Sequence, residues 1–206
     1  SLTGAAVVKR TTEMKRNSWQ EYQKEVADDR YYYLRSCIRQ NFFPGSEKAF
    51  VRILRQELGR DLFDDPVHTS CTGIGYHSDI VPLETIMTVV ARQFALASEA
   101  GYENLAVSCI TSFGIYTEIL ETWQEFPELE AKVREHLFRA TGREFRKPKN
   151  VSHASDIIFH HREAIRQRAA YLLVNRRTGE PLRGVEHIGC HYAKIFPKEG
   201  IGGVEF

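Results

Sequence analysis

Two stretches of the chain share one pattern, and this repeat constrains the domain organisation. SCIRQNFFP begins at Ser36 and GCHYAKIFP begins at Gly189, and in each a cysteine that closes a strand-like run is followed seven residues later by a proline. An internal repeat of this kind implies two similar domains, each with a cysteine just beyond a strand. We therefore expect a chain cut short at Phe206. The expected parts are a polar N-terminal extension over residues 1–30, a first cysteine-rich domain over 31–180 and the incomplete beginning of a second over 181–206.

Apolar periodicity predicts helices that alternate with short strands. The strongest pattern runs from Leu83 to Ala97 and ends at Gly101, with apolar residues along one helical face. Other expected helices cover residues 47–58, 115–123, 127–140 and a segment capped by Ser155 or Asp156 that runs to about residue 173. Expected strands cover residues 31–34, 104–108 and 185–188. This alternation predicts an α/β fold with a parallel sheet flanked by helices.

Composition narrows the class of protein. The chain has 206 residues, of which 42% are hydrophobic and 27% charged, as in ordinary globular proteins. A net charge of +1 provides no field that would attract nucleic acid or an anionic membrane. No apolar run approaches the length of a membrane span, and the N-terminus lacks the apolar core of a signal peptide. We expect a cytoplasmic protein.

The cysteines follow the predicted strands. Cys37, Cys109 and Cys190 come directly after strand patterns, and Cys71 precedes a loop that contains glycines. Loops at the carboxyl ends of parallel strands converge on one rim, so cysteines far apart in sequence can meet there. Thiolates are soft ligands suited to iron–sulfur clusters or zinc. The alternative is that these cysteines are small buried apolar residues, and spacing does not decide between the two.

Four stretches resemble the B subunit of heterodisulfide reductases, a family with cysteine-rich CCG domains. YYYLRSCIRQNFFPGSEKA resembles the start of the family's first such domain, and SCTGIGYHSDIVPLETIMTVVARQFALASEAG resembles the segment in which a CC pair precedes a long helix. AVSCITSFGIYTE is similar to the family's CxxCxxxxxE stretch, and VEHIGCHYAK to the start of its second domain. The resemblance extends from Tyr31 to Phe206.

The resemblance implies a set of metal ligands and shows where this chain departs from it. The matched positions are Cys37, Cys71, Cys109 and Cys190. Thr72 stands where the second cysteine of the CC pair would be, and Ser112 where CxxC would close. Hydroxyls are poor ligands for a soft iron centre, so we expect an incomplete or non-standard cluster of the 4Fe-4S type. Zinc is the alternative, with His77 or His68 as a fourth ligand.

The function that the resemblance implies is that of one oxidoreductase component in sulfur metabolism. Through an iron–sulfur cluster it would supply electrons to, or remove them from, a disulfide, thiol or sulfur carrier, and the sequence does not fix the direction. Its partners would be other heterodisulfide-reductase-like subunits, one with iron–sulfur clusters (the C subunit) and one with flavin (the A subunit). His191 would donate a proton to a departing thiolate, or simply form a hydrogen bond in its loop.

The same residues allow other functions. The loss of two ligands resembles variants in bacterial sulfur oxidation. The alternative is a zinc-bound or metal-free scaffold. A nucleotide-binding domain is disfavoured because Gly73 and Gly75 lack the third glycine of the dinucleotide fingerprint.

Overall fold

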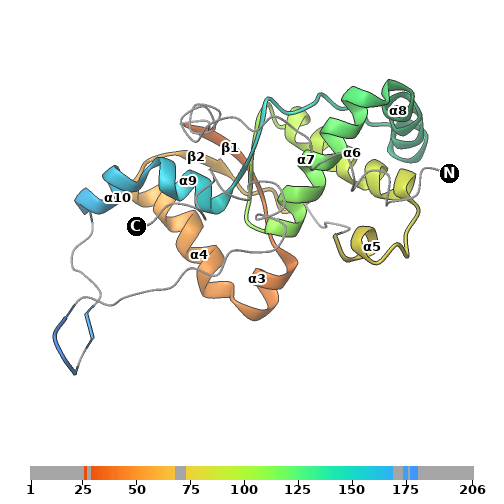
Figure 1. The fold of residues 1–206 in the computed structure, drawn as a ribbon. Helices are drawn as coiled ribbons and strands as arrows, with labels where there is room; N and C mark the ends of the chain where they lie inside the picture. Colours follow the sequence, from red (N-terminus) through yellow and green to blue (C-terminus); the bar gives the residue numbers. More distant parts are fainter. Residues whose placement is uncertain (1–25, 27–28, 68–72, 169–173, 176, 181–206) are drawn as a thin grey trace.

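The computed structural model describes residues 26, 29–67, 73–168, 174–175 and 177–180. Four strands in these residues form one parallel sheet in the order β2-β1-β3-β4. They are β1 (Arg30–Leu34), β2 (Asp61–Phe63), β3 (Asn104–Val107) and β4 (Asn150–His153). The predicted α/β class with a helix-flanked parallel sheet is confirmed (Figure 1).

Helices fill the connections between the strands. Between β1 and β2 lie α3 (Cys37–Phe42), α4 (Pro44–Arg52) and a π-helical turn η1 (Ile53–Glu57), and between β2 and β3 lie α5 (Gly73–His77) and α6 (Leu83–Glu99). The remaining helices are α7 (Ile110–Glu125), α8 (Pro127–Thr141), α9 (Ala154–His160) and α10 (Arg162–Arg168).

Strand β1 is the central element of the sheet. Its four residues Tyr31 to Leu34 are at most 1% exposed, which explains their unbroken apolar and aromatic character. Tyr32 pairs with Phe63 of β2 on one side and with Leu105 of β3 on the other. A strand paired on both edges and covered on both faces must be apolar at every position, and this is why its pattern was recognisable in the sequence.

Successive side chains of β1 enter two different cores, because strand side chains alternate between faces. Tyr32 and Leu34 join a large cluster built with α6, α7 and α8. Tyr31 and Tyr33 join a second cluster with Phe50 of α4, η1 and α9. Figure 1 shows the same division, with α6, α7 and α8 grouped on one side and α4, α9 and α10 on the other.

Several predicted boundaries differ from the observed ones. The helix expected over 47–58 begins at Pro44, and the one expected over 115–123 begins at Ile110. The helix over 127–140 and the long helix from Leu83 are confirmed within two residues. Strands β2 and β4 and helices α3 and α5 were not predicted, because they are short and β4 reads as the polar stretch NVSH.

The predicted cap at Ser155 or Asp156 is wrong. His153 caps α9, and its ring accepts a hydrogen bond from the Ser155 backbone. Asp156 instead occupies the third helical position, and its carboxylate accepts a bond from the backbone of His153. The helix expected to reach about residue 173 is interrupted at His161, between α9 and α10.

Other expectations lie outside the described residues. They are the extension over 1–30 apart from Val26, Asp29 and Arg30, and the beginning of a second domain over 181–206, including the strand expected over 185–188. Among the helices that are described, none is both long and apolar enough to cross a membrane.

Candidate functional site

The carboxyl edge of the sheet contains a change in the direction of winding. From β1 the chain continues to β2 on one side, and it then returns to form β3 on the opposite side of β1. Open parallel sheets bind ligands beyond the carboxyl ends of their strands at such a switch point. The candidate site therefore lies beyond Leu34 and Val107, which are register partners.

Cys37 begins the first helix after β1 and is exposed. Ser36 immediately before it is the N-cap, and its side chain accepts a hydrogen bond of 3.1 Å from the backbone N–H of Arg39. Serine is favoured at this position because its oxygen satisfies one of the free N–H groups of the first turn. The tight turn from strand to helix therefore places Cys37 at the edge of the sheet.

Cys109 occupies the matching place after β3. It is the N-cap residue of α7, with an extended backbone, and it is half-buried. The backbone N–H of Ser108 donates to the carbonyl of Leu34 at 3.3 Å, which extends the pairing of β1 and β3 by one bond. The structure thus brings the segments of Cys37 and Cys109 to the same rim, while their role as metal ligands stays a prediction.

A buried carboxylate lies beneath this rim. Glu47 of α4 is 7% exposed, and its Oε1 accepts bonds from the backbone N–H of Ser36 at 3.2 Å and from the hydroxyl of Ser108 at 2.8 Å. Its other oxygen accepts a hydrogen bond from the hydroxyl of Tyr33. Burial and the bond to Glu47 hold the pKa of Tyr33 well above its ordinary value, so this hydroxyl stays protonated and donates. The residues that precede Cys37 and Cys109 are thus joined through one carboxylate.

Ser112 stands where the family resemblance calls for a cysteine. It is 2% exposed, and its Oγ has no hydrogen-bond partner among the described residues. A buried hydroxyl without a partner is unfavourable and uncommon in proteins. The position is therefore one that a less polar sulfur atom, or a group held at this edge, would suit better than a serine does.

Cys71, Thr72 and His68 lie outside the described residues, but the helix that follows them is described. Tyr76 of α5 donates from its hydroxyl to the carboxylate of Glu118 in α7 at 2.9 Å. Burial and the charge of Glu118 hold the pKa of Tyr76 above its ordinary value. The helix that follows Cys71 is therefore joined to the helix that begins after Cys109.

His153 ends β4 at the same edge of the sheet and was not predicted as a site residue. It is 8% exposed, and its ring lies 5.9 Å from that of Phe113. Burial, reinforced by the charge of Arg39, lowers the pKa of His153 to about 4, against a bond to the backbone of Ser108 that raises it. The ring is neutral at physiological pH and caps α9.

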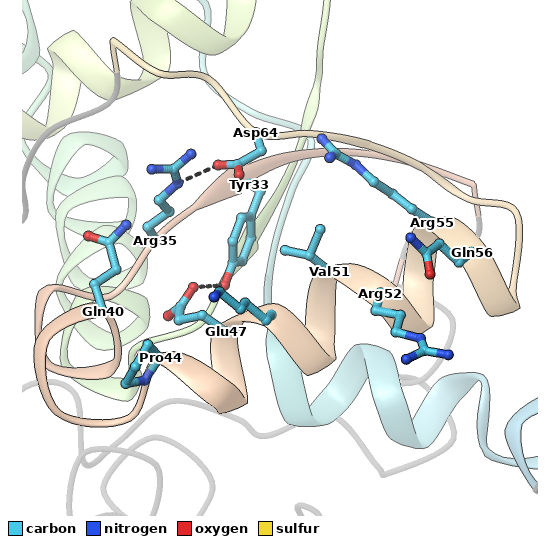
Figure 2. Close-up of a pocket in the computed structure, with 11 residues that line it drawn as sticks. Tyr33, Arg35, Gln40, Pro44, Glu47, Val51, Arg52, Arg55, Gln56 and Asp64 are labelled. Carbon is cyan, nitrogen blue, oxygen red and sulfur yellow. Dashed lines mark hydrogen bonds and ion pairs between the residues drawn. The ribbon is translucent and has the colours of Figure 1, made fainter.

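A cavity of about 490 Å³ adjoins the buried carboxylate, beside the carboxyl ends of β1 and β2. Figure 2 shows Tyr33 and Glu47, among the residues that line this cavity, pointing toward one another, and Arg35 pointing to Asp64. The bond between Arg35 Nε and the Asp64 carboxylate is 2.5 Å. Neither Cys37 nor Cys109 is among the residues that line it.

The described residues contain no cluster of three or more histidine, cysteine or acidic side chains that could hold a metal. His77, suggested as a zinc ligand, is exposed at the end of α5, where its ring lies 5.1 Å from that of Tyr76. Cys190 and His191 lie outside the described residues. Of the four predicted cysteine ligands, only Cys37 and Cys109 are therefore placed.

Comparison with known proteins adds one informative relative. No family model matches the chain. The B subunit of the ferredoxin:CoB-CoM heterodisulfide reductase of Methanosarcina acetivorans is 26% identical over 190 residues, which cover 88% of this chain. The match spans 58% of the relative's length. It supports the resemblance drawn from the cysteine-containing stretches.

Reasoning from the sequence missed the polar residues that connect the site, above all Glu47, Ser36 and Ser108. A signal was present, because each of the first three cysteines directly follows a serine. The Ser-Cys dipeptide did not indicate which group the serine would bond. The carboxylate that joins Ser36 to Ser108 belongs to Glu47, which is 61 positions away from Ser108 in the chain.

Proposed function

We propose that this chain is a component similar to the B subunit of heterodisulfide reductases, and that its first domain binds an iron–sulfur cluster through Cys37, Cys71 and Cys109. The observation that carries the proposal is the arrangement of two of these cysteines. Cys37 and Cys109 follow adjacent parallel strands at the switch point of the sheet, and one buried carboxylate joins the residues before them. The relative from Methanosarcina acetivorans supports the same assignment.

The donor set fits a cluster with an incomplete set of protein ligands. Thiolates suit iron, whereas Thr72 and Ser112 offer only hydroxyls where the family pattern has cysteines. The buried Oγ of Ser112, which has no partner in the described part of the chain, is consistent with a position built for sulfur. When bound, the cluster would supply one-electron transfer.

The chain's own residues would hold and shield this centre. Ser36 and Ser108 would orient the cysteine segments, while Phe113 and His153 would limit access of water from the side of β4. In the proposed complex, iron–sulfur and flavin subunits would exchange electrons with this domain. A second domain containing Cys190 and His191 would act on the disulfide, thiol or sulfur carrier, with His191 supplying the proton.

A structural role is the second candidate, and the two hydroxyl replacements favour it. Cys37, Cys71 and Cys109 are one ligand short of a tetrahedral zinc site. A zinc-bound or metal-free domain of this kind would organise a larger complex without transferring electrons. The two candidates differ in which metal the protein contains and in whether folding depends on it.

The deciding experiment measures iron, zinc and acid-labile sulfide in protein purified without oxygen, for the wild type, Cys109→Ser and Ser98→Ala. We expect iron with matching sulfide in the wild type and in Ser98→Ala, whose altered hydroxyl bonds Ala95 within α6. Cys109→Ser should lose most of the iron and keep its circular dichroism spectrum. Zinc alone, with unfolding of Cys109→Ser, would support the scaffold instead, and absence of both metals would exclude a cluster-binding role.

A further inference from the structure

Three pairs in the described part of the molecule have a tyrosine hydroxyl that donates to a carboxylate, two of them buried and the third partly buried. They are Tyr33 with Glu47, Tyr32 with Asp65 and Tyr76 with Glu118. Glu47 differs from the other two carboxylates because it also accepts bonds from the residues directly before two cysteines. A carboxylate has enough lone pairs for all three donors, so each of its bonds can form at once.

The bonds of Glu47 join three separate elements. Tyr33 lies in β1, Ser36 caps α3, and Ser108 follows β3. Both Ser36 N and Ser108 Oγ lie within 3.2 Å of the same oxygen, so the two backbone segments cannot separate without breaking one of these bonds. Hydrogen bonds to a charged acceptor are about twice as strong as neutral ones, and burial raises the cost of leaving the carboxylate unpaired.

We propose that Glu47 is a positioning residue, which keeps the thiols of Cys37 and Cys109 at a separation suited to one shared metal centre. The inference deepens the proposed function and rests on the two cysteines being ligands. Glu47 itself does not contact the metal, and it acts through Ser36 and Ser108. Outer partners that orient metal ligands typically change metal affinity by about 10- to 100-fold when they are removed.

The test uses cadmium as a probe, because a bound Cd²⁺ reports thiolate ligation by a charge-transfer absorption and does not require the native cofactor. The metal-free, reduced protein is titrated with Cd²⁺, and the wild type is compared with Cys37→Ser and Cys109→Ser. Each of these cysteine variants should weaken binding. If neither does, the two thiols do not share a metal and the positioning role is wrong.

The positioning variants are Glu47→Leu and the milder Ser108→Ala, which removes one hydroxyl and leaves the carboxylate in place. We expect Glu47→Leu to weaken Cd²⁺ binding by about 10- to 100-fold, and Ser108→Ala to weaken it by a smaller factor. Glu47→Gln keeps the length and one carbonyl acceptor for Ser36 and Ser108, so it should retain most of the affinity.

Matched controls separate positioning from general stability. Asp65→Asn alters a buried carboxylate that also accepts a tyrosine hydroxyl, at 2.7 Å, but has no bond to Ser36 or Ser108. Ser98→Ala removes a hydroxyl that bonds within α6. Both controls should bind Cd²⁺ within about threefold of the wild type, which is well under the change expected for Glu47→Leu.

Equal affinity of wild type and Ser108→Ala would overturn the proposal, and this variant is conservative enough to fold if Glu47→Leu does not. Equal losses in Asp65→Asn and Glu47→Leu would also overturn it, because the effect would then follow from stability. If Cd²⁺ binding behaves as expected while the purified protein contains neither iron nor sulfide, the positioning role stands and the iron–sulfur function fails.

Discussion

At the scale of single residues, the polar groups of the site form nearly all of their hydrogen bonds with other groups of the protein. Ser36 caps a helix and presents its backbone N–H to Glu47, while Ser108 donates its hydroxyl to the same oxygen. Ser112 is different, because its buried hydroxyl has no partner among the described residues. A buried serine without a hydrogen-bond partner lowers the free energy of unfolding, and the size of this effect can be measured.

Ser112→Ala should raise the free energy of unfolding by about 1 kcal/mol, because it removes a hydroxyl that was desolvated without a compensating bond. Urea unfolding of the metal-free protein measures the change. Ser98→Ala is the matched control, since it deletes a hydroxyl that does bond a carbonyl, at 2.9 Å, and it should not stabilise. Destabilisation by Ser112→Ala would mean that the hydroxyl has a partner in the folded protein.

His153 makes stability depend on pH. Its pKa is about 4 in the folded protein and near 6.5 when unfolded, so the unfolded chain binds more protons between these values. The free energy of unfolding should therefore fall as the pH drops from about 6.5 to about 4, by up to about 1.4 kcal/mol per pH unit.

His153→Asn tests this origin, because asparagine is a good N-cap and does not titrate. Urea unfolding at a series of pH values between 7 and 4 should give a flatter profile for this variant than for the wild type. Ser98→Ala, which changes no titratable group, is the control and should keep the wild-type profile. Parallel profiles for wild type and His153→Asn would show that other groups cause the pH dependence.

At the scale of elements, the short helix α5 depends on a close approach to the chain before α6. A Cβ atom at Gly75 would lie 2.8 Å from Cγ2 and 3.3 Å from Cβ of Val81. Valine is stiff about its first side-chain bond, so it cannot easily turn away. Glycine is therefore needed here to let α5 pack closely while Tyr76 reaches Glu118.

Gly75→Ala should lower the free energy of unfolding by about 1 to 3 kcal/mol, as overpacking does, although alanine is the better helix former. The double variant Gly75→Ala with Val81→Ala should lose less than the sum of the two single variants, because the clash is removed. Urea unfolding of the wild type, the two single variants and the double variant gives the four free energies of this double-mutant cycle. Additive losses would exclude the contact as the cause.

At the scale of the whole molecule, strand order decides which residues become neighbours. Because β3 lies beside β1, the segments of Cys37 and Cys109 end at one rim, and Glu47 can join them. The described part of the connection from β2 to β3 includes α5 and α6, and Tyr76 of α5 bonds Glu118 of α7. This arrangement explains how two cysteine segments that lie 72 positions apart in the chain reach one edge of the sheet.

Local pattern was enough to predict the class of fold, the central strand and the long helix from Leu83, because burial on one or both faces leaves a periodic signature in the sequence. It was also enough to place Cys37 and Cys109 after strands. The sequence did not reveal β2 or β4, which are three and four residues long and take their stability from pairing.

Only the tertiary structure decided that β1 and β3 are neighbours, that His153 caps α9 and that Ser108 meets Glu47. These contacts depend on packing between segments far apart in the chain, as the separation of 61 positions between Glu47 and Ser108 illustrates. Periodicity within a segment shows which of its faces is buried but not which segment will cover it. The position of Cys37 and Cys109 after strands could therefore be predicted from the sequence, whereas the carboxylate that joins their segments could not.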